Sequence, residues 1–333
     1  EGRRYAALGT SKALYIYYED KFYDITPLAT AITGATFTST SSSNIVTVNK
    51  VSHALDLGEY ITFTSVTIPG TSSFIDTDFT SFTFEILSVP DADSFTIQMQ
   101  TTETGTPMSS TGSASINPYE EIGPTIQTYG YGWGTGSWSR LTWGSGTTSS
   151  TIILDPGSWS LDNFGEQLIA TIKDGKTFTW NPGVSNPLDQ RASIMVGAPT
   201  ASRLTITSDR DRHVVHFGTE TTIGDSTTQD PMFIRFSDQE NYNIYQPTSI
   251  NTAGTFRLDT GNKIVAAISG KDYNLILTDQ AAYQMQFVGP PFTFSIRQVG
   301  SNCGCIGQHA AVYADGKVFW MGAGGGFFVF DGT

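Results

Sequence analysis

Residues 168–180 read LIATIKDGKTFTW, two short apolar segments joined by a polar turn. Asp-Gly between alternating aliphatic and aromatic residues is a strong hairpin signal, because this pair adopts the tight turn that joins antiparallel strands. The same unit recurs along the chain: a short apolar strand, a polar turn and a second strand rich in aromatic residues. The copies lie at residues 13–27, 168–180, 213–236, 274–285 and 311–330.

The spacing of these hairpins indicates a repeated unit. From the second copy on they begin about 45, 60 and 40 residues apart, near the length of a β-propeller blade with its loops. One four-stranded blade cannot bury both of its apolar faces, so blades stack around an axis. Helical periodicity is nearly absent, and the best helix candidate, residues 160–172, ends in a strand-like alternation. The sequence therefore predicts an all-β fold based on a β-propeller, complete or incomplete.

Residues 29–116 differ in composition from the rest of the chain and interrupt the first blade. They are rich in Thr and Ser, with one Lys and no Arg, and their alternating segments predict a small antiparallel β-sandwich or barrel. These segments lie at residues 45–48, 60–63, 82–86 and 95–99. The predicted organisation is a first propeller hairpin (1–28), the inserted domain (29–116), an aromatic and Gly-rich connecting segment (117–150) and the remaining blades (151–333).

Charge and composition exclude several classes of function. The chain has 333 residues and a formal net charge of -13. Specific nucleic-acid binding is disfavoured, because neutralising phosphates requires an excess of Lys and Arg. An acidic protein can nevertheless let DNA pass without adhering to it. No apolar run approaches the roughly 18 residues of a membrane-spanning segment.

The cysteines and the chain ends give two further expectations. A single residue separates Cys303 from Cys305, and on a strand this spacing disfavours a disulfide, so the fold does not depend on disulfides.

The first five residues lack Met and an apolar signal core, and the last residues directly follow a strand pattern. We therefore expect both ends to be cut from a longer polypeptide.

No convincing catalytic or metal-binding constellation emerges from the sequence. His213 and His216 are three residues apart, which on a strand places them on opposite faces and not as a zinc pair. Three carboxylate pairs have residue types that suit a glycosidase or calcium site, but each lies in a turn or linker where solvated carboxylates are usual. The pairs are Asp76/Asp78, Asp91/Asp93 and Glu120/Glu121. We expect no catalytic residue, no cofactor, no metal and no enzymatic activity.

Several stretches outside the insert resemble a family of structural proteins encoded in the genomes of tailed phages. The resemblance spans residues 1–30 and 117–333. Its motifs are at residues 133–144, 161–166, 208–210, 230–240, 251–254, 287–292, 318–322 and 328–332. Within the insert only residues 53–61 are similar, and Gly58-Glu59 stands where the family usually has Gly-Asp.

The resemblance implies a tail nozzle or tail-stabilising protein of a short-tailed phage. Such a chain assembles as a ring, typically a hexamer, below the head–tail adaptor, and the genome is ejected through its channel. Implied partners are further copies of the chain, the adaptor, tail fibre or spike proteins, and passing DNA, and the implied location is the virion tail. No catalytic residues belong to the family pattern. The hypothesis for the ring interface is the segment containing Trp133, Trp138 and Trp143.

Two alternatives stay open. The first is a carbohydrate-binding or host-adhesion protein, which would gather Trp and Tyr beside Asn and Asp in a concave site. The second is a propeller hydrolase, which needs two carboxylates converging about 5 to 10 Å apart. The sequence leaves blade number, ring order, the channel-lining surface and the role of the insert undetermined.

Overall fold

A computed structural model describes residues 4–123, 127–129, 150–152, 157–208 and 210–332. Of the described residues, 48% are in strands and 4% in helices, which confirms the all-β prediction. Contacts divide it into two compact units, residues 1–25 with 122–333, and residues 26–121. No helix among the described residues is long and apolar enough to cross a membrane.

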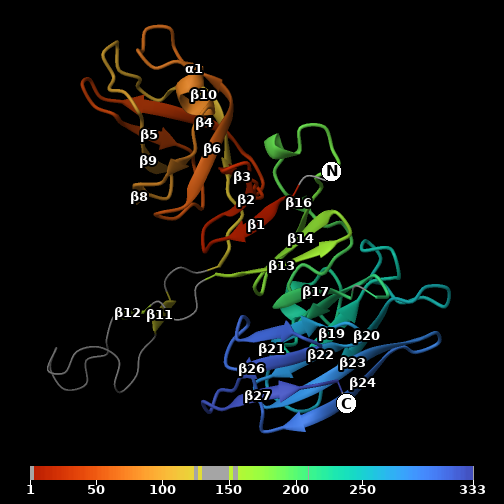
Figure 1. Cartoon of the computed structure of the whole chain (residues 1–333). Helices are drawn as coiled ribbons and strands as arrows, with labels where there is room; N and C mark the ends of the chain where they lie inside the picture. The colour runs from red at the N-terminus through yellow and green to blue at the C-terminus, as the bar shows by residue number, and fades with distance from the viewer. Residues whose placement is uncertain (1–3, 124–126, 130–149, 153–156, 209, 333) are drawn as a thin grey trace, which may run out of the picture. The chain divides into compact units, whose positions relative to one another are not determined.

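Among the described residues of the first unit, five antiparallel sheets of three or four strands each pair their strands in chain order (Figure 1). We call them blades 1 to 5. Blade 1 comprises β1 (Ala6–Gly9), β2 (Leu14–Tyr18) and β3 (Lys21–Asp24). Blade 2 comprises β13 (Trp159–Phe164), β14 (Gln167–Ile172), β15 (Thr177–Trp180) and β16 (Ser193–Ile194). Blade 3 comprises β17 (Leu204–Ser208), β18 (His213–Phe217), β19 (Phe233–Phe236) and β20 (Gly254–Arg257).

Blades 4 and 5 complete the series. Blade 4 comprises β21 (Ile264–Ser269), β22 (Asn274–Thr278), β23 (Ala281–Gly289) and β24 (Thr293–Ser301). Blade 5 comprises β25 (Ala311–Ala314), β26 (Lys317–Met321) and β27 (Phe327–Phe330). A separate two-stranded sheet pairs β11 (Gln127–Tyr129) with β12 (Ser150–Ile152).

The hairpins predicted from the sequence are present in all five blades. In blade 2, Leu168 pairs with Trp180, and the turn residue Asp174 has φ 57°, a left-handed conformation that Asp tolerates. In blades 2 to 4 the predicted hairpins are the second and third strands. The helix candidate at residues 160–172 is instead the β13–β14 hairpin, because tertiary packing favours extended backbone there.

Apolar side chains fill the space between successive blades. The first strands are neighbours in the order β1, β13, β17, β21 and β25, so the blades follow one another around their inner strands. Between blades 1 and 2 the core includes Ile16 and Trp159, and between blades 4 and 5 it includes Leu275 and Trp320. Each fully buried side chain of this kind contributes roughly 1.5–3 kcal/mol.

The second unit is one curled seven-stranded antiparallel sheet in the order β7-β6-β10-β4-β5-β9-β8. Its strands are β4 (Ile32–Ser39), β5 (Ile45–Asn49), β6 (Tyr60–Thr67), β7 (Phe84–Glu85), β8 (Ser88–Asp91), β9 (Ser94–Gln98) and β10 (Thr111–Pro118). β7 also contacts β9, so the sheet wraps around a core that contains Phe37, Phe63 and Phe95. The short helix α1 (Asp76–Thr80) adds the buried Phe79 to this core.

Candidate functional site

The interface residues predicted from the sequence, Trp133, Trp138 and Trp143, lie outside the described residues. Their role therefore stays a prediction. The structure instead draws attention to two apolar blade faces, a cavity between blades 1 and 2, and a network of buried polar groups.

The far face of blade 5 is apolar and uncovered. Side chains alternate along its strands, so that Val318, Trp320 and Phe330 pack toward blade 4 while their neighbours point outward. The outward-facing side chains are Val312, Phe319, Met321, Phe327 and Val329. Val312 pairs with Phe319, Phe319 with Val329, and Met321 with Phe327, so these five form one continuous patch.

The far face of blade 1 has a similar composition. Leu14 and Ile16 pack toward blade 2, and the alternate residues of the blade point the other way. On that side Leu8, Tyr17 and Phe22 are exposed, and Tyr17 pairs with Phe22 in the β2–β3 register. Blades 1 and 5 therefore each use one face inside the unit, and no other described residues cover their aromatic and aliphatic far faces.

A cavity of about 840 Å³ lies between blades 1 and 2. Two aromatic rings form part of its wall, with Tyr5 edge-on to Trp180 at a centroid separation of 5.3 Å. The indole N–H of Trp180 donates to the Pro187 carbonyl at 3.0 Å, which fixes the ring. The polar lining residues are Arg4, Asp162, Asn163 and Glu166. Aromatic carbon next to planar polar groups is the lining expected of a site for a hydroxyl-rich ligand.

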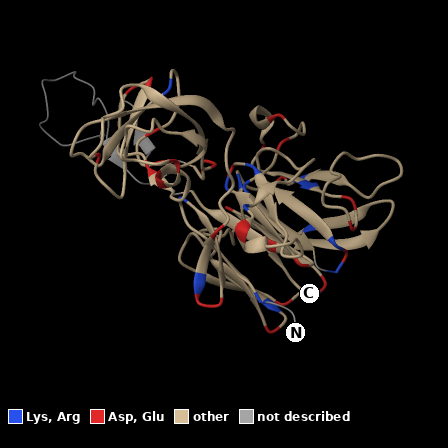
Figure 2. Cartoon of the chain, turned by 90° about the horizontal axis from the view of Figure 1, so that it is seen from above, with Lys and Arg blue, Asp and Glu red and all other residues tan. Residues whose placement is uncertain are grey.

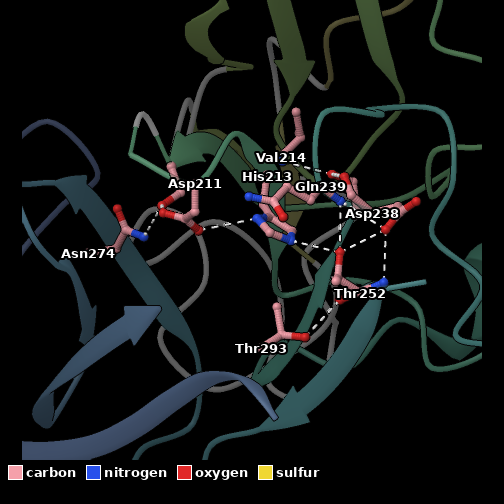
Figure 3. A network of polar contacts seen from close by, with 10 residues as sticks. Asp211, His213, Val214, Asp238, Gln239, Thr252, Asn274 and Thr293 are labelled. Atoms are coloured by element: carbon pink, nitrogen blue, oxygen red, sulfur yellow. Dashed lines mark hydrogen bonds and ion pairs between the residues drawn. The ribbon is translucent and has the colours of Figure 1, made fainter. Parts of the chain in front are cut away.

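His213 lies between the Asp211 carboxylate and the Thr252 hydroxyl, an arrangement similar to the Asp–His–Ser triad of hydrolases (Figure 3). Its Nδ1 lies 3.2 Å from Asp211 Oδ2, and its Nε2 lies 3.1 Å from Thr252 Oγ1. However, His213 is fully buried, and the Thr252 hydroxyl already donates to Asp238 Oδ1 at 2.7 Å. The hydroxyl therefore has no proton to give to His213, and substrate has no access to it.

The same network holds blade 3 against blade 4. Asn274 on β22 donates to Ser208 Oγ at 3.1 Å, and the Thr293 hydroxyl donates to the Thr252 carbonyl at 3.1 Å (Figure 3). His213 also contacts the ring of Phe294 at 5.1 Å between centroids. These contacts make the His213 cluster a structural brace between two blades.

His216 faces the opposite side of β18, as the spacing predicts. Its Nδ1 lies 3.1 Å from the hydroxyls of Ser202 and Thr205, and its Nε2 lies 3.0 Å from the Tyr245 hydroxyl. Burial, and secondarily the positive charge of Arg235, lower the pKa of His216 to about 3. The side chain is therefore neutral at physiological pH, and it stabilises the interior of the unit.

Two of the three carboxylate pairs singled out in the sequence, Asp76/Asp78 and Asp91/Asp93, organise local backbone. Asp76 accepts from the Ile68 amide at 2.9 Å, and Asp78 accepts from the Ile75 amide at 2.9 Å. Asp91 accepts from the Asp93 amide at 2.9 Å. In the described part of the chain, no group of three or more His, Cys, Asp or Glu side chains is placed to hold a metal ion.

Two buried carboxylates were not recognised in the sequence. Glu103 in the second unit and Glu220 in the first are both fully buried. Glu220 accepts from the Gly224 amide at 2.6 Å and from the Thr200 amide at 2.7 Å. Both lie in polar Thr-rich stretches that read as solvated loops, so the sequence carries no signal for their burial.

Comparisons with known proteins add little to this description. No protein-family model matches the chain, and no curated protein matches it. Among solved structures it is similar to a phage phi92 endosialidase, with 13% identity over 95% of this chain and 52% of that chain, and a TM-score of 0.27. The chain thus spans about half the length of that protein. A TM-score of this size supports no conclusion about the fold or the activity of this chain.

Proposed function

We propose that the chain is a structural protein of a phage tail that assembles with further copies into a ring below the head–tail adaptor, through which the genome is ejected. The motif resemblance named above supports the virion role. The observation that carries the assembly is the uncovered apolar face of blade 5, formed by Val312, Phe319, Met321, Phe327 and Val329. Contiguous exposed apolar patches of this kind mark interaction surfaces.

The partner of this face is the far face of blade 1 in the next copy. Inside the unit blades 2, 3 and 4 each pack one face on the blade before it and one on the blade after it. Among the described residues no blade packs on the far face of blade 5 or on that of blade 1, and both faces expose aromatic and aliphatic side chains that can pack on one another. A contact between two different faces is head-to-tail, and it generates a closed ring when the rotation closes.

The acidic composition suits a conduit. DNA carries one negative charge per roughly 1.7 Å of axis, so a channel rich in cations would retain it. A chain with a net charge of -13 repels the passing backbone instead.

Mass photometry of the chain and two variants tests the proposal. Phe327 is 83% exposed on β27, the edge strand of the blade 5 face, and Phe292 is 79% exposed in the β23–β24 turn and belongs to neither face. The wild type is expected to form a discrete ring of about six subunits, the number that the resemblance implies. Phe327→Asp should give monomers, and the matched Phe292→Asp should leave the ring intact. A wild type that stays monomeric at micromolar concentration, or a ring that survives Phe327→Asp, contradicts the proposal.

A second candidate function is glycan binding in the cavity between blades 1 and 2. The observation that favours it is the presence of Tyr5 and Trp180 beside Asp162 and Asn163 in one concave site. A glycan array should show binding that Asn163→Ala abolishes and that Gln190→Ala, an exposed amide not among the lining residues, leaves unchanged. An array without signal, or equal binding by both variants, removes this candidate.

A further inference from the structure

A second cavity, of about 440 Å³, collects residues from four blades at one end of the propeller axis. In an up-and-down blade, the start of the first strand and the turn between the second and third strands lie at the same end. Arg203 and Lys263 directly precede the first strands of blades 3 and 4. Lys173 and Asp279 directly follow the second strands of blades 2 and 4, and His309 precedes blade 5. All five residues line this axial cavity.

The charge of the axial cavity is opposite to that of the chain. Lys173, Arg203 and Lys263 line it, against the single lining carboxylate of Asp279. The whole chain has 18 Lys and Arg against 31 Asp and Glu. Charged residues are sparse over the ribbon as a whole, most of which is uncharged (Figure 2). With Asp174 paired to Arg203, the site still has one more cation than carboxylates, and its low-dielectric walls concentrate that positive field.

The acidic groups nearby are already engaged. Asp279 accepts from the Asn262 amide at 2.8 Å and from Asn262 Nδ2 at 2.9 Å. Burial alone would raise the pKa of Asp279, but these hydrogen bonds outweigh it and the pKa is lowered. Asp174 accepts from Arg203 Nη1 at 3.3 Å and from Gln229 at 3.0 Å, which holds the half-buried guanidinium in position at the cavity wall.

A run of backbone donors completes the lining. The turn at residues 307–309 precedes blade 5, and all three of its residues line the axial cavity. Within the described part of the chain, the N–H groups of Gly307, Gln308 and His309 donate to no protein acceptor, whereas the following Ala310 amide donates to the Gly307 carbonyl. Successive backbone N–H groups in a turn form concavities that bind anions.

We propose that the axial cavity binds a small molecule through a carboxylate or phosphate group, which Lys263, Arg203 and the 307–309 turn receive together. The volume lies within the range of roughly 300–1,000 Å³ that small-molecule sites occupy. The proposal is independent of ring assembly and of the cavity between blades 1 and 2.

Isothermal titration calorimetry at low salt tests the site with three probes: inorganic phosphate, glucuronate as a sugar carboxylate, and glucose as the neutral control. At least one of the two anions should bind with a Kd below about 1 mM, which is a binding free energy of roughly -4 kcal/mol. Glucose should not bind. Binding of phosphate alone or of glucuronate alone identifies the anionic group, and the affinity should fall as salt rises.

Two Lys variants localise the binding. Lys263→Gln should raise the Kd about tenfold or more, since a hydrogen bond to a charged group contributes roughly 1.5–3 kcal/mol. Lys271→Gln is the matched control, because Lys271 lies in the β21–β22 turn at the opposite end of the same blade. The absence of saturable binding by both anions, or equal weakening in the two variants, would overturn the proposal.

Discussion

Glu103→Gln should selectively destabilise the second unit. Its Oε1 accepts from the Ser73 amide and hydroxyl at 2.8 Å each and from the Gly105 amide at 2.9 Å. Its Oε2 accepts from the hydroxyls of Ser72 at 2.7 Å and Ser39 at 3.0 Å. Burial alone would raise the pKa of Glu103, but these donors outweigh it and hold the pKa at about 2.

The pKa sets both the size and the pH range of the effect. Lowering from 4.5 to about 2 corresponds to roughly 3 kcal/mol of stability, at about 1.4 kcal/mol for each pH unit. Because the folded pKa lies below the unfolded value, this stability is present above pH 4.5 and is lost as the pH falls toward 2. A Gln side chain keeps one acceptor oxygen, but its NH₂ group faces hydroxyls that in the wild type donate to the carboxylate. We therefore expect the free energy of unfolding to fall by about 3 kcal/mol at pH 7.

Differential scanning calorimetry of the whole chain should resolve the change, with hydrogen exchange at β5 and β9 assigning the transition of the second unit. A loss of 3 kcal/mol lowers the melting temperature of a domain of 60–100 residues by roughly 12–24 °C. Glu85→Gln makes the same chemical change at an exposed position of the same unit and should have little effect. Equal shifts in the two variants, or an unaltered acid dependence of the second unit in Glu103→Gln, would refute the reasoning.

Three further predictions concern the first unit. Because the folded pKa of His216, about 3, lies below its usual value, the stability that the neutral ring contributes is present above pH 6.5 and is lost, by several kcal/mol, as the pH falls toward 3. The free energy of urea unfolding should therefore be lower at pH 4 than at pH 7, and an equal pH dependence in His216→Gln would contradict this. Glu220→Gln removes a buried carboxylate that accepts from the Gly224 and Thr200 amides and should cost about 1–3 kcal/mol in urea unfolding. A stability equal to that of the wild type would be inconsistent with this account. Gly304→Ala would place a Cβ in collision with the Asp279 carbonyl oxygen, so we expect a lower melting temperature, whereas Gly324→Ala meets nothing within 4 Å and should melt like the wild type. Equal melting temperatures of the two variants would contradict this steric account.

The sequence by itself determined the local elements of this protein. Residues 168–180 specify a hairpin because alternating side chains and the turn at Asp174 act within a dozen residues, and the structure forms it. The placement of His213 and His216 on opposite faces follows in the same way from the two-residue period of a strand. Alternation also indicated four strands of the inserted domain, β5, β6, β7 and β9, but not β4, β8 or β10. The five-residue helix α1 was too short to give a periodic signal.

Only the tertiary structure decided which polar groups are buried and which apolar faces are left uncovered. Glu103 lies in a Thr-rich stretch that reads as a solvated loop, and its burial depends on hydroxyls from Ser39 and Ser72 that come from distant parts of the chain. The axial cavity likewise joins Lys173 to His309 through the stacking of four blades. Such contacts depend on long-range packing, and periodicity along the chain reports only on neighbours a few residues apart.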